Sequence, residues 1–184
     1  MPSPSQFRCS VAGPDLLQAL ATAPLPLGLR ELSSATSFHR DLYFDTPEST
    51  LRARDVVCRL RYRSDGRCVL SWTGPKATAT NDPAGRHVEV ELEAQEPMAA
   101  LTGDNDPARR VRAFTEPALL RTQIELSVTR TTRIARSGWL RRGRVECVLD
   151  DVMLRHGELS GAFQELKVRR SGRGGPSLER LARA

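Results

Sequence analysis

Hydrophobic and polar residues alternate along most of this chain, and strict alternation is typical of β-strands with one apolar and one polar face. The segments with this pattern are residues 7–11, 38–44, 56–63, 67–75, 86–93, 119–135, 145–152 and 163–169. Asp65-Gly66 stands between the third and the fourth of them, and Asp-Gly in that position is a strong signal for a β-hairpin turn. The pattern therefore predicts a mainly β domain.

Helical patterns are fewer and shorter. They are expected at residues 15–20, 46–54 and 97–114, the last with a break near Gly103, and from residue 177 to the chain end. In the second of them, Thr46 suits the N-cap and Pro47 the first helical position. Connections are expected at residues 76–85, 137–138, 142–143 and 172–176. Residues 1–171 should therefore form one domain, and 172–184 a linker and the start of a C-terminal helix that would continue in a longer protein.

Successive residues of a strand point to opposite faces, so charged side chains can be sorted by parity. Arg59, Arg61 and Arg63 share one face of their strand. The polar faces of four further strands carry Glu89, Glu91 and Glu93; Glu125 and Arg133; Arg144, Glu146 and Asp150; and Glu165 and Lys167. A solvated face explains any one of these strands. Charged polar faces on five strands together favour a sheet that closes around a polar interior. There, Arg side chains would hold anionic oxygens and carboxylates would hold a hard divalent metal.

Composition adds an excess of basic residues, 28 against 22 acids in 184 residues, for a net charge of +6 and a pI near 9.8. All but Lys76 and Lys167 of these bases are Arg, whose planar fork of donors matches phosphate oxygens. A nucleic-acid-binding β domain is one reading of this charge. Aromatic residues are only 5% of the chain, and no stacking platform for bases is apparent, which weighs against that reading.

Several classes of protein are excluded by what the chain lacks. No apolar run reaches the roughly 18–20 residues of a membrane span, and no signal-peptide pattern opens the sequence. The four cysteines form no C-x-x-C pair, so reduced thiols and a cytoplasmic location are expected. The glycine motifs of P-loop, dinucleotide-binding and serine-hydrolase proteins are absent.

Five segments, in a fixed order, carry a resemblance to a known family. They are Tyr43-Phe44-Asp45-Thr46-Pro47, the stretch from Leu51 that ends in Cys58-Arg59-Leu60-Arg61, Ser71-Trp72-Thr73-Gly74-Pro75, the strand 145–152 with Leu149-Asp150, and Phe163-Gln164-Glu165-Leu166-Lys167. In this order the segments resemble the motifs of the CYTH family, also called triphosphate tunnel metalloenzymes. Its members include class IV adenylate cyclases, thiamine triphosphatases and inorganic triphosphatases. The resemblance covers about residues 38–170.

The resemblance implies an α+β, mainly β fold, in which a closed antiparallel β-barrel forms a tunnel and helices pack outside it. The 1–171 domain would be this tunnel domain. The ligands would be triphosphates, which the family hydrolyses or cyclises with Mg²⁺ or Mn²⁺. Inward Arg and Lys residues would hold the phosphates, and inward carboxylates would hold the metal.

Carried over position by position, the resemblance implies two sets of site residues. The phosphate-binding set is Arg59, Arg61 and Arg133, and the metal-binding set is Glu89, Glu91, Asp150 and Glu165. Arg130 has the opposite parity to Arg133 and is not included. Asp45 and Thr46 match the signature, but a helix-capping role is expected for them. No catalytic residue is assigned.

The chain departs from the family at several charged positions. The E-x-E-x-K motif of the first strand falls on Pro2, Pro4 and Gln6, with Arg8 as the only charge nearby. Thr73 and Thr131 stand where the family has basic residues, and Lys167 stands where it has a second Glu. Because losing one positioned charge can cost about 10²–10³ in rate, several losses could leave binding without turnover.

The family positions that are kept and those that are lost leave two possible functions. The first is a domain that binds triphosphate or polyphosphate in a β tunnel and hydrolyses it with a divalent metal. The alternative is a catalytically degenerate tunnel that serves as a module for polyphosphate or phosphorylated ligands. The expected partner is a small anion, with neither a membrane nor a nucleic acid, and a homodimer or a further C-terminal domain is left open.

Overall fold

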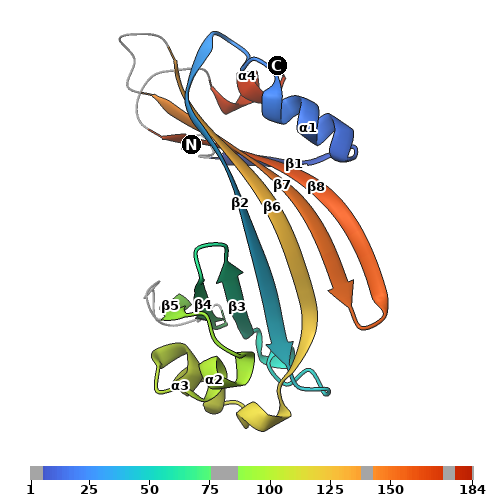
Figure 1. The fold of residues 1–184 in the computed structure, drawn as a ribbon, viewed down its shortest axis with the longest axis vertical. Helices are drawn as coiled ribbons and strands as arrows, with labels where there is room; N and C mark the ends of the chain where they lie inside the picture. The colour runs from blue at the N-terminus through green and yellow to red at the C-terminus, as the bar shows by residue number, and fades with distance from the viewer. Residues whose placement is uncertain (1–5, 76–86, 138–142, 172–176, 184) are drawn as a thin grey trace. The chain divides into compact units, whose positions relative to one another are not determined.

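The computed structural model describes residues 6–75, 87–137, 143–171 and 177–183, which form strands and a few short helices (Figure 1). The strands are β1 (Gln6–Val11), β2 (Leu29–Asp45), β3 (Val57–Arg63), β4 (Arg67–Thr73), β5 (His87–Glu93), β6 (Arg121–Ser137), β7 (Arg144–His156) and β8 (Leu159–Ser171). The helices are α1 (Pro14–Thr22), α2 (Pro97–Thr102), α3 (Asp106–Arg112) and α4 (Leu178–Ala182), with 3₁₀ turns at Arg52–Arg54 and Pro117–Leu119.

The strands follow the hydrogen-bonded order β1-β8-β7-β6-β2-β3-β4-β5. Pairing is antiparallel between β1 and β8, β2 and β3, β3 and β4, and β4 and β5. The predicted mainly β, antiparallel fold with few helices is therefore confirmed. Within the described residues the order ends at β1 and β5, so closure of the sheet into a barrel stays a prediction.

The chain divides into two compact units that share the long strands. The terminal unit comprises Met1–Phe38, Val128–Met153 and Ala162–Ala184, and the central unit comprises His39–Ser127 and Leu154–Gly161. The expected division into a 1–171 domain and a C-terminal segment stays a prediction. Each unit has an apolar cluster and a polar sheet face of its own.

In the central unit, one face of β3 and β4 is apolar and packs against helices. Cys58 and Leu60 of β3 and Leu70 of β4 are almost fully buried in this cluster, to which α2 and α3 contribute Leu101 and Val111. The turn that joins β3 to β4 contains Gly66 at φ +77°, a conformation that glycine adopts without strain, so the predicted Asp-Gly hairpin is confirmed. The opposite face of these strands is left for charged residues, as parity predicts.

In the terminal unit, the apolar cluster centres on Leu29, Ala135, Val145 and Val168, with partly buried Leu181 from α4 packed against it. On β8, Val168 has the opposite parity to the charged residues Glu165 and Lys167. Alternation therefore separates apolar from charged side chains on this strand too.

Two segments differ from their predictions. β2 begins at Leu29, nine residues before the expected start, because pairing with β6 supports a stretch that does not alternate. The helix expected at residues 46–54 is instead a turn followed by the 3₁₀ turn at Arg52–Arg54. That segment is held by the carboxylate of Asp45, which accepts hydrogen bonds from three backbone N–H groups. The expected capping role of Asp45 is therefore confirmed, although it stabilises a turn and not an α-helix.

The helix break near Gly103 is confirmed by the separate helices α2 and α3, and Ser177 caps α4 through its side chain. The connections expected at 76–85 and 172–176 lie outside the described residues, as do Gly138 and Arg142 of the two expected turns. In the described part of the chain, no helix has the length and apolar character to cross a membrane.

All four cysteines are free thiols, as expected. Cys58 and Cys68 are buried in the central unit, whereas Cys9 on β1 is exposed. Burial, with a smaller contribution from the charge of Asp45, raises the pKa of Cys58 to about 12. This thiol therefore stays protonated and acts as a small apolar side chain.

Candidate functional site

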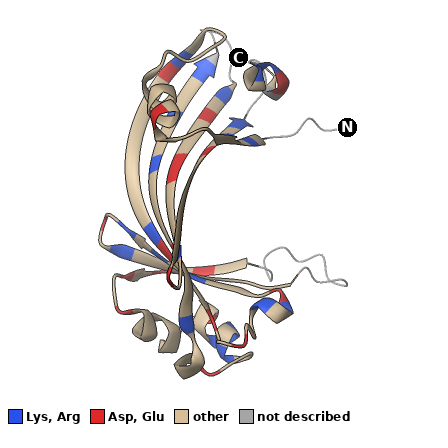
Figure 2. Ribbon diagram, turned by 90° about the vertical axis from the view of Figure 1, so that its right-hand side faces the viewer, with Lys and Arg blue, Asp and Glu red and all other residues tan. Residues whose placement is uncertain are grey.

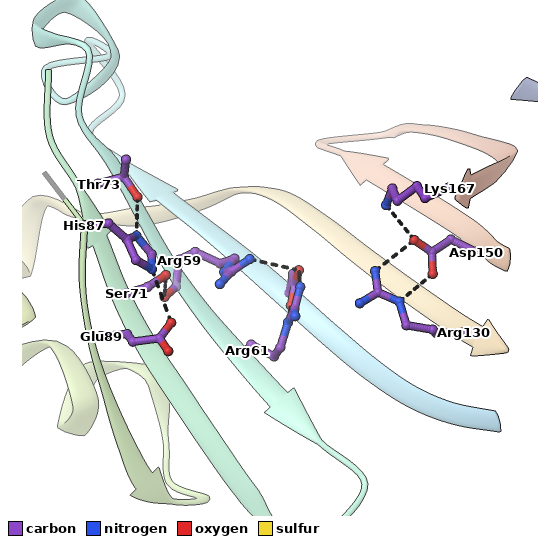
Figure 3. Close-up of polar contacts among 10 residues, drawn as sticks. Arg59, Arg61, Ser71, Thr73, His87, Glu89, Arg130, Asp150 and Lys167 are labelled. Carbon is purple, nitrogen blue, oxygen red and sulfur yellow. Dashed lines mark hydrogen bonds and ion pairs between the residues drawn. The ribbon is translucent and has the colours of Figure 1, made fainter. Parts of the chain in front are cut away.

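Basic and acidic residues are interspersed along the strands of both units (Figure 2). In the central unit, the pairing register aligns Tyr43 of β2, Arg59 of β3, Ser71 of β4 and Glu89 of β5 in one row across the sheet. The next row on the same face, two residues along each strand, begins with Asp41 and Arg61. The two sequence-predicted arginines of β3 thus share one polar face with carboxylates from the neighbouring strands (Figure 3).

Asp41 is the buried partner of Arg61. It is 2% exposed, and it accepts hydrogen bonds from Nε of Arg61 at 2.7 Å and from Nη2 at 2.6 Å. The bidentate pairing orients the guanidinium and neutralises a carboxylate that water barely reaches. The sequence interpretation did not identify Asp41, although its parity in the segment 38–44, opposite Leu42 and Phe44, is a signal that could have found it.

Arg59 is paired with Asp41 more weakly than Arg61 is. Its Nη1 lies 3.9 Å from Oδ2 of Asp41, which is an ion pair without a short hydrogen bond. Its Nε is buried and has no hydrogen-bond partner within residues 6–75, 87–137, 143–171 and 177–183. The side chain as a whole is 23% exposed, so the accessible part of this guanidinium, which the long ion pair leaves weakly held, suits an anionic ligand oxygen.

The two predicted metal ligands of β5 have other partners in the central unit. Glu91 accepts hydrogen bonds from Arg67 and from Nη1 of Arg63, the latter at 2.9 Å. Glu89 is more than half exposed and lies 3.3 Å from Nε2 of His87, whose Nδ1 lies 2.9 Å from Oγ1 of Thr73 (Figure 3). Glu91 is thus held between two guanidinium groups and Glu89 faces solvent.

In the terminal unit, five charged side chains form a connected group, which we name the terminal cluster: Arg8, Arg130, Asp150, Glu165 and Lys167. Asp150 lies at its centre and is 2% exposed. Its Oδ1 accepts from Nε of Arg130 at 2.6 Å, and its Oδ2 accepts from Nη2 of Arg130 at 2.8 Å and from Nζ of Lys167 at 2.7 Å. Figure 3 shows Arg130 and Lys167 both reaching this carboxylate.

Glu165 completes the terminal cluster. Its Oε1 lies 2.9 Å from Nε of Arg8, and its Oε2 lies 2.8 Å from Nζ of Lys167. The pairing of β1 with β8 brings these groups together, since Arg8 stands directly opposite Lys167. Every carboxylate oxygen of Asp150 and Glu165 therefore has a cationic partner from the chain itself.

The ion pairs of the terminal cluster also affect the titration of Asp150. Burial by itself raises the pKa of this carboxyl, but the hydrogen bonds and charges of Arg130 and Lys167 outweigh burial, and the pKa falls below its ordinary value of 3.8. A carboxyl whose pKa is lowered by folding stabilises the folded state above its ordinary pKa. That contribution disappears as the pH falls through the lowered pKa.

We therefore expect Asp150→Asn to lower the free energy of unfolding at pH 7, and we expect this loss to shrink as the pH falls from about 4 to about 2. The measurement is urea unfolding of both proteins across that range. Asp104→Asn is the control, because the side chain of Asp104 is 90% exposed and its pairing with Arg109 is solvated. A difference between wild type and Asp150→Asn that does not change with pH would contradict the expectation.

Arg133 does not face the carboxylates of the terminal cluster; it is paired with another carboxylate, Glu31. It is 6% exposed, and its Nε donates to Oε2 of Glu31 at 2.6 Å while its Nη1 donates to the carbonyl of Leu20 at 2.8 Å. It borders the apolar cavity under α1, together with Leu149 and Val168. The expectation from parity that Arg133 shares the polar face with Asp150 is therefore wrong. Parity along β6 does not tell which of its faces lies over the helices, and the residue that reaches Asp150 is Arg130.

The resemblance implies a divalent metal, which would need a group of carboxylate or other donor side chains close together. Among the described residues, no group of three or more His, Cys, Asp or Glu side chains is arranged to hold a metal ion. Glu91, Asp150 and Glu165 are each paired with two or three cationic donors, and Glu89 is paired with His87 alone among the described side chains. The residues present do not fit a divalent cation.

Comparison with known proteins shows the family to which this chain is similar. A family model described as the CYTH domain matches residues 10–174. A Hippeastrum protein, provisionally an adenylyl cyclase and with a dominant triphosphatase activity, has a similar fold at 17% identity, with a TM-score of 0.52 and coverage of 96% of this chain and 81% of that chain. A provisional adenylate cyclase from Bacillus halodurans is 16% identical, with a TM-score of 0.50 and coverage of 98% and 84%. No curated protein matches the chain.

Proposed function

The chain belongs to the CYTH domain family, and we propose on this premise that it binds inorganic triphosphate or a related linear polyphosphate. The observation that carries the proposal is Arg59 on the polar face of β3: its side chain is 23% exposed, and among the described residues its Nε has no hydrogen-bond partner. Its neighbour Arg61 is oriented by Asp41 and adds a second positive charge two residues along the same strand face. Phosphate oxygens match the donor geometry of both side chains.

Binding without turnover is the form of this function that we favour. Three of the four carboxylates predicted to hold a metal, Glu91, Asp150 and Glu165, are paired with Arg or Lys within their own unit. The triphosphatase activity of the Hippeastrum protein belongs to that protein, which shares the fold at 17% identity. Our proposal is therefore a phosphate-binding module, acting in a reducing cytoplasm in keeping with the free cysteines.

Calorimetric titration and thermal unfolding with sodium tripolyphosphate test the proposal. A ligand at about 100 times its Kd stabilises the folded state by about 2.7 kcal/mol. For a chain of this size that corresponds to a rise in Tm of roughly 5–10 °C. Orthophosphate at the same concentration should give a much smaller rise, since it presents fewer charged oxygens.

Three results would contradict the proposed binding module. No heat of binding and no change in Tm at millimolar tripolyphosphate would remove the proposed function. Tight binding of single-stranded DNA with a steep salt dependence would instead favour the nucleic-acid reading of the basic composition. Orthophosphate release from tripolyphosphate above the no-protein background, measured in the same samples, would favour hydrolysis over the module.

A further inference from the structure

We infer that the terminal cluster binds oligophosphate directly through Arg and Lys, without a bridging divalent cation. The inference rests on the proposed function and concerns residues of the terminal unit alone. It concerns the cluster formed by Arg8, Arg130, Asp150, Glu165 and Lys167. Two neighbouring carboxylates would ordinarily favour a hard metal ion, because Asp and Glu oxygens are its preferred ligands.

The contacts of Asp150 leave no room for that metal. Both oxygens accept charge-assisted hydrogen bonds at 2.6–2.8 Å from Arg130 and Lys167. Asp150 is 2% exposed, so water cannot replace these donors without opening the sheet face. A divalent cation would have to displace a bidentate guanidinium from a buried carboxylate, which is among the strongest pairings that side chains make.

Lys167 blocks the second carboxylate in the same way. Its Nζ lies 2.7 Å from Oδ2 of Asp150 and 2.8 Å from Oε2 of Glu165, and so occupies the point between the two groups where a shared metal ion would lie. Its side chain is 18% exposed, so repulsion between the ammonium and an added cation would be only partly screened. The lysine thus takes the place that a divalent ion would need.

The charge balance then favours an anion. Three cationic side chains face two carboxylates in the terminal cluster, which leaves one surplus positive charge. Nε and Nη2 of Arg130 are used by Asp150, and its Nη1 has no partner in the described contacts. Arg8 is 60% exposed and holds Glu165 through Nε. N–H groups on both arginines therefore remain available to phosphate oxygens.

Paired titrations of tripolyphosphate, one in EDTA and one in excess Mg²⁺, test the inference on the wild-type chain. We expect binding in EDTA to be as tight as in Mg²⁺ or several-fold tighter, because Mg²⁺ removes negative charge from the ligand. An affinity at least tenfold weaker in EDTA would overturn the inference and leave the proposed function standing. Absence of binding in both buffers would instead overturn the proposed function.

A second measurement does not depend on triphosphate. Calorimetry with Mn²⁺ alone should give no binding to wild type below about millimolar concentration. Lys167→Glu replaces the ammonium with a third carboxylate and should create Mn²⁺ binding, and Lys167→Gln, which removes charge without adding a ligand, should not. Mn²⁺ binding to wild type that Lys167→Glu does not strengthen would contradict the inference. If Lys167→Glu fails to fold, as seen by circular dichroism, the wild type and Lys167→Gln still decide the question.

Discussion

Replacing Asp45 with alanine is expected to lower the free energy of unfolding by about 3–5 kcal/mol. Oδ1 of Asp45 accepts hydrogen bonds from the backbone N–H groups of Thr46 and Leu51, both at 2.8 Å, and Oδ2 accepts from Arg52 at 3.0 Å. Asp45 is 9% exposed and Leu51 is fully buried, so two or three donors would lose their partner away from water. Each loss of this kind costs about 1–3 kcal/mol.

Urea unfolding followed by circular dichroism measures this effect, and Tm should fall by on the order of 10 °C. Glu48→Ala is the matched control, because it removes one carboxylate from the same turn at an exposed position and should change stability by less than about 0.5 kcal/mol. Asp45→Asn keeps one acceptor oxygen and should fall between the two. If Asp45→Ala is as stable as Glu48→Ala, the carboxylate does not hold this turn.

Arg59→Gln is expected to weaken tripolyphosphate binding by about 10–100-fold, with a change in stability of less than about 1 kcal/mol. Its Nε has no hydrogen-bond partner in the part of the chain that the structure describes, and its ion pair with Asp41 is 3.9 Å long, so little intramolecular bonding is lost. A charge-assisted hydrogen bond to the ligand contributes about 1.5–3 kcal/mol. Since about 1.4 kcal/mol corresponds to a tenfold change in Kd, its loss accounts for the expected weakening of binding.

Two variants serve as controls for Arg59→Gln. Arg109→Gln removes the same charge from α3, where the side chain is half exposed, and should leave affinity unchanged. Arg61→Gln should reduce stability as well as affinity, because it removes the bidentate partner of buried Asp41. Equal affinity of wild type and Arg59→Gln for tripolyphosphate would sink the assignment of Arg59 as a ligand-binding residue.

Alternation was sufficient to predict the faces of β3 and β4. Their hairpin is local, and one face of the pair packs on a cluster that includes α2 and α3, so the period of two maps directly onto buried and polar sides. The same rule failed for Arg133 on the 17-residue strand β6. Polar residues occur on both of its faces, and helix α1 supplies a carbonyl acceptor for a buried arginine that no period can anticipate.

The sequence by itself determined the family, the mainly β antiparallel fold, the faces of the regular strands and the loss of acidic residues from the first strand, because motif order and periodicity are properties of the chain. Only the tertiary structure decided what each charge does. Arg8, Arg130, Asp150 and Lys167 come from four different strands, and their pairing depends on which strands become neighbours and in which register. From the sequence alone, Asp150 and Glu165 are interpreted as metal ligands. In the structure they lie beside Arg130, Lys167 and Arg8 and neutralise these cationic side chains.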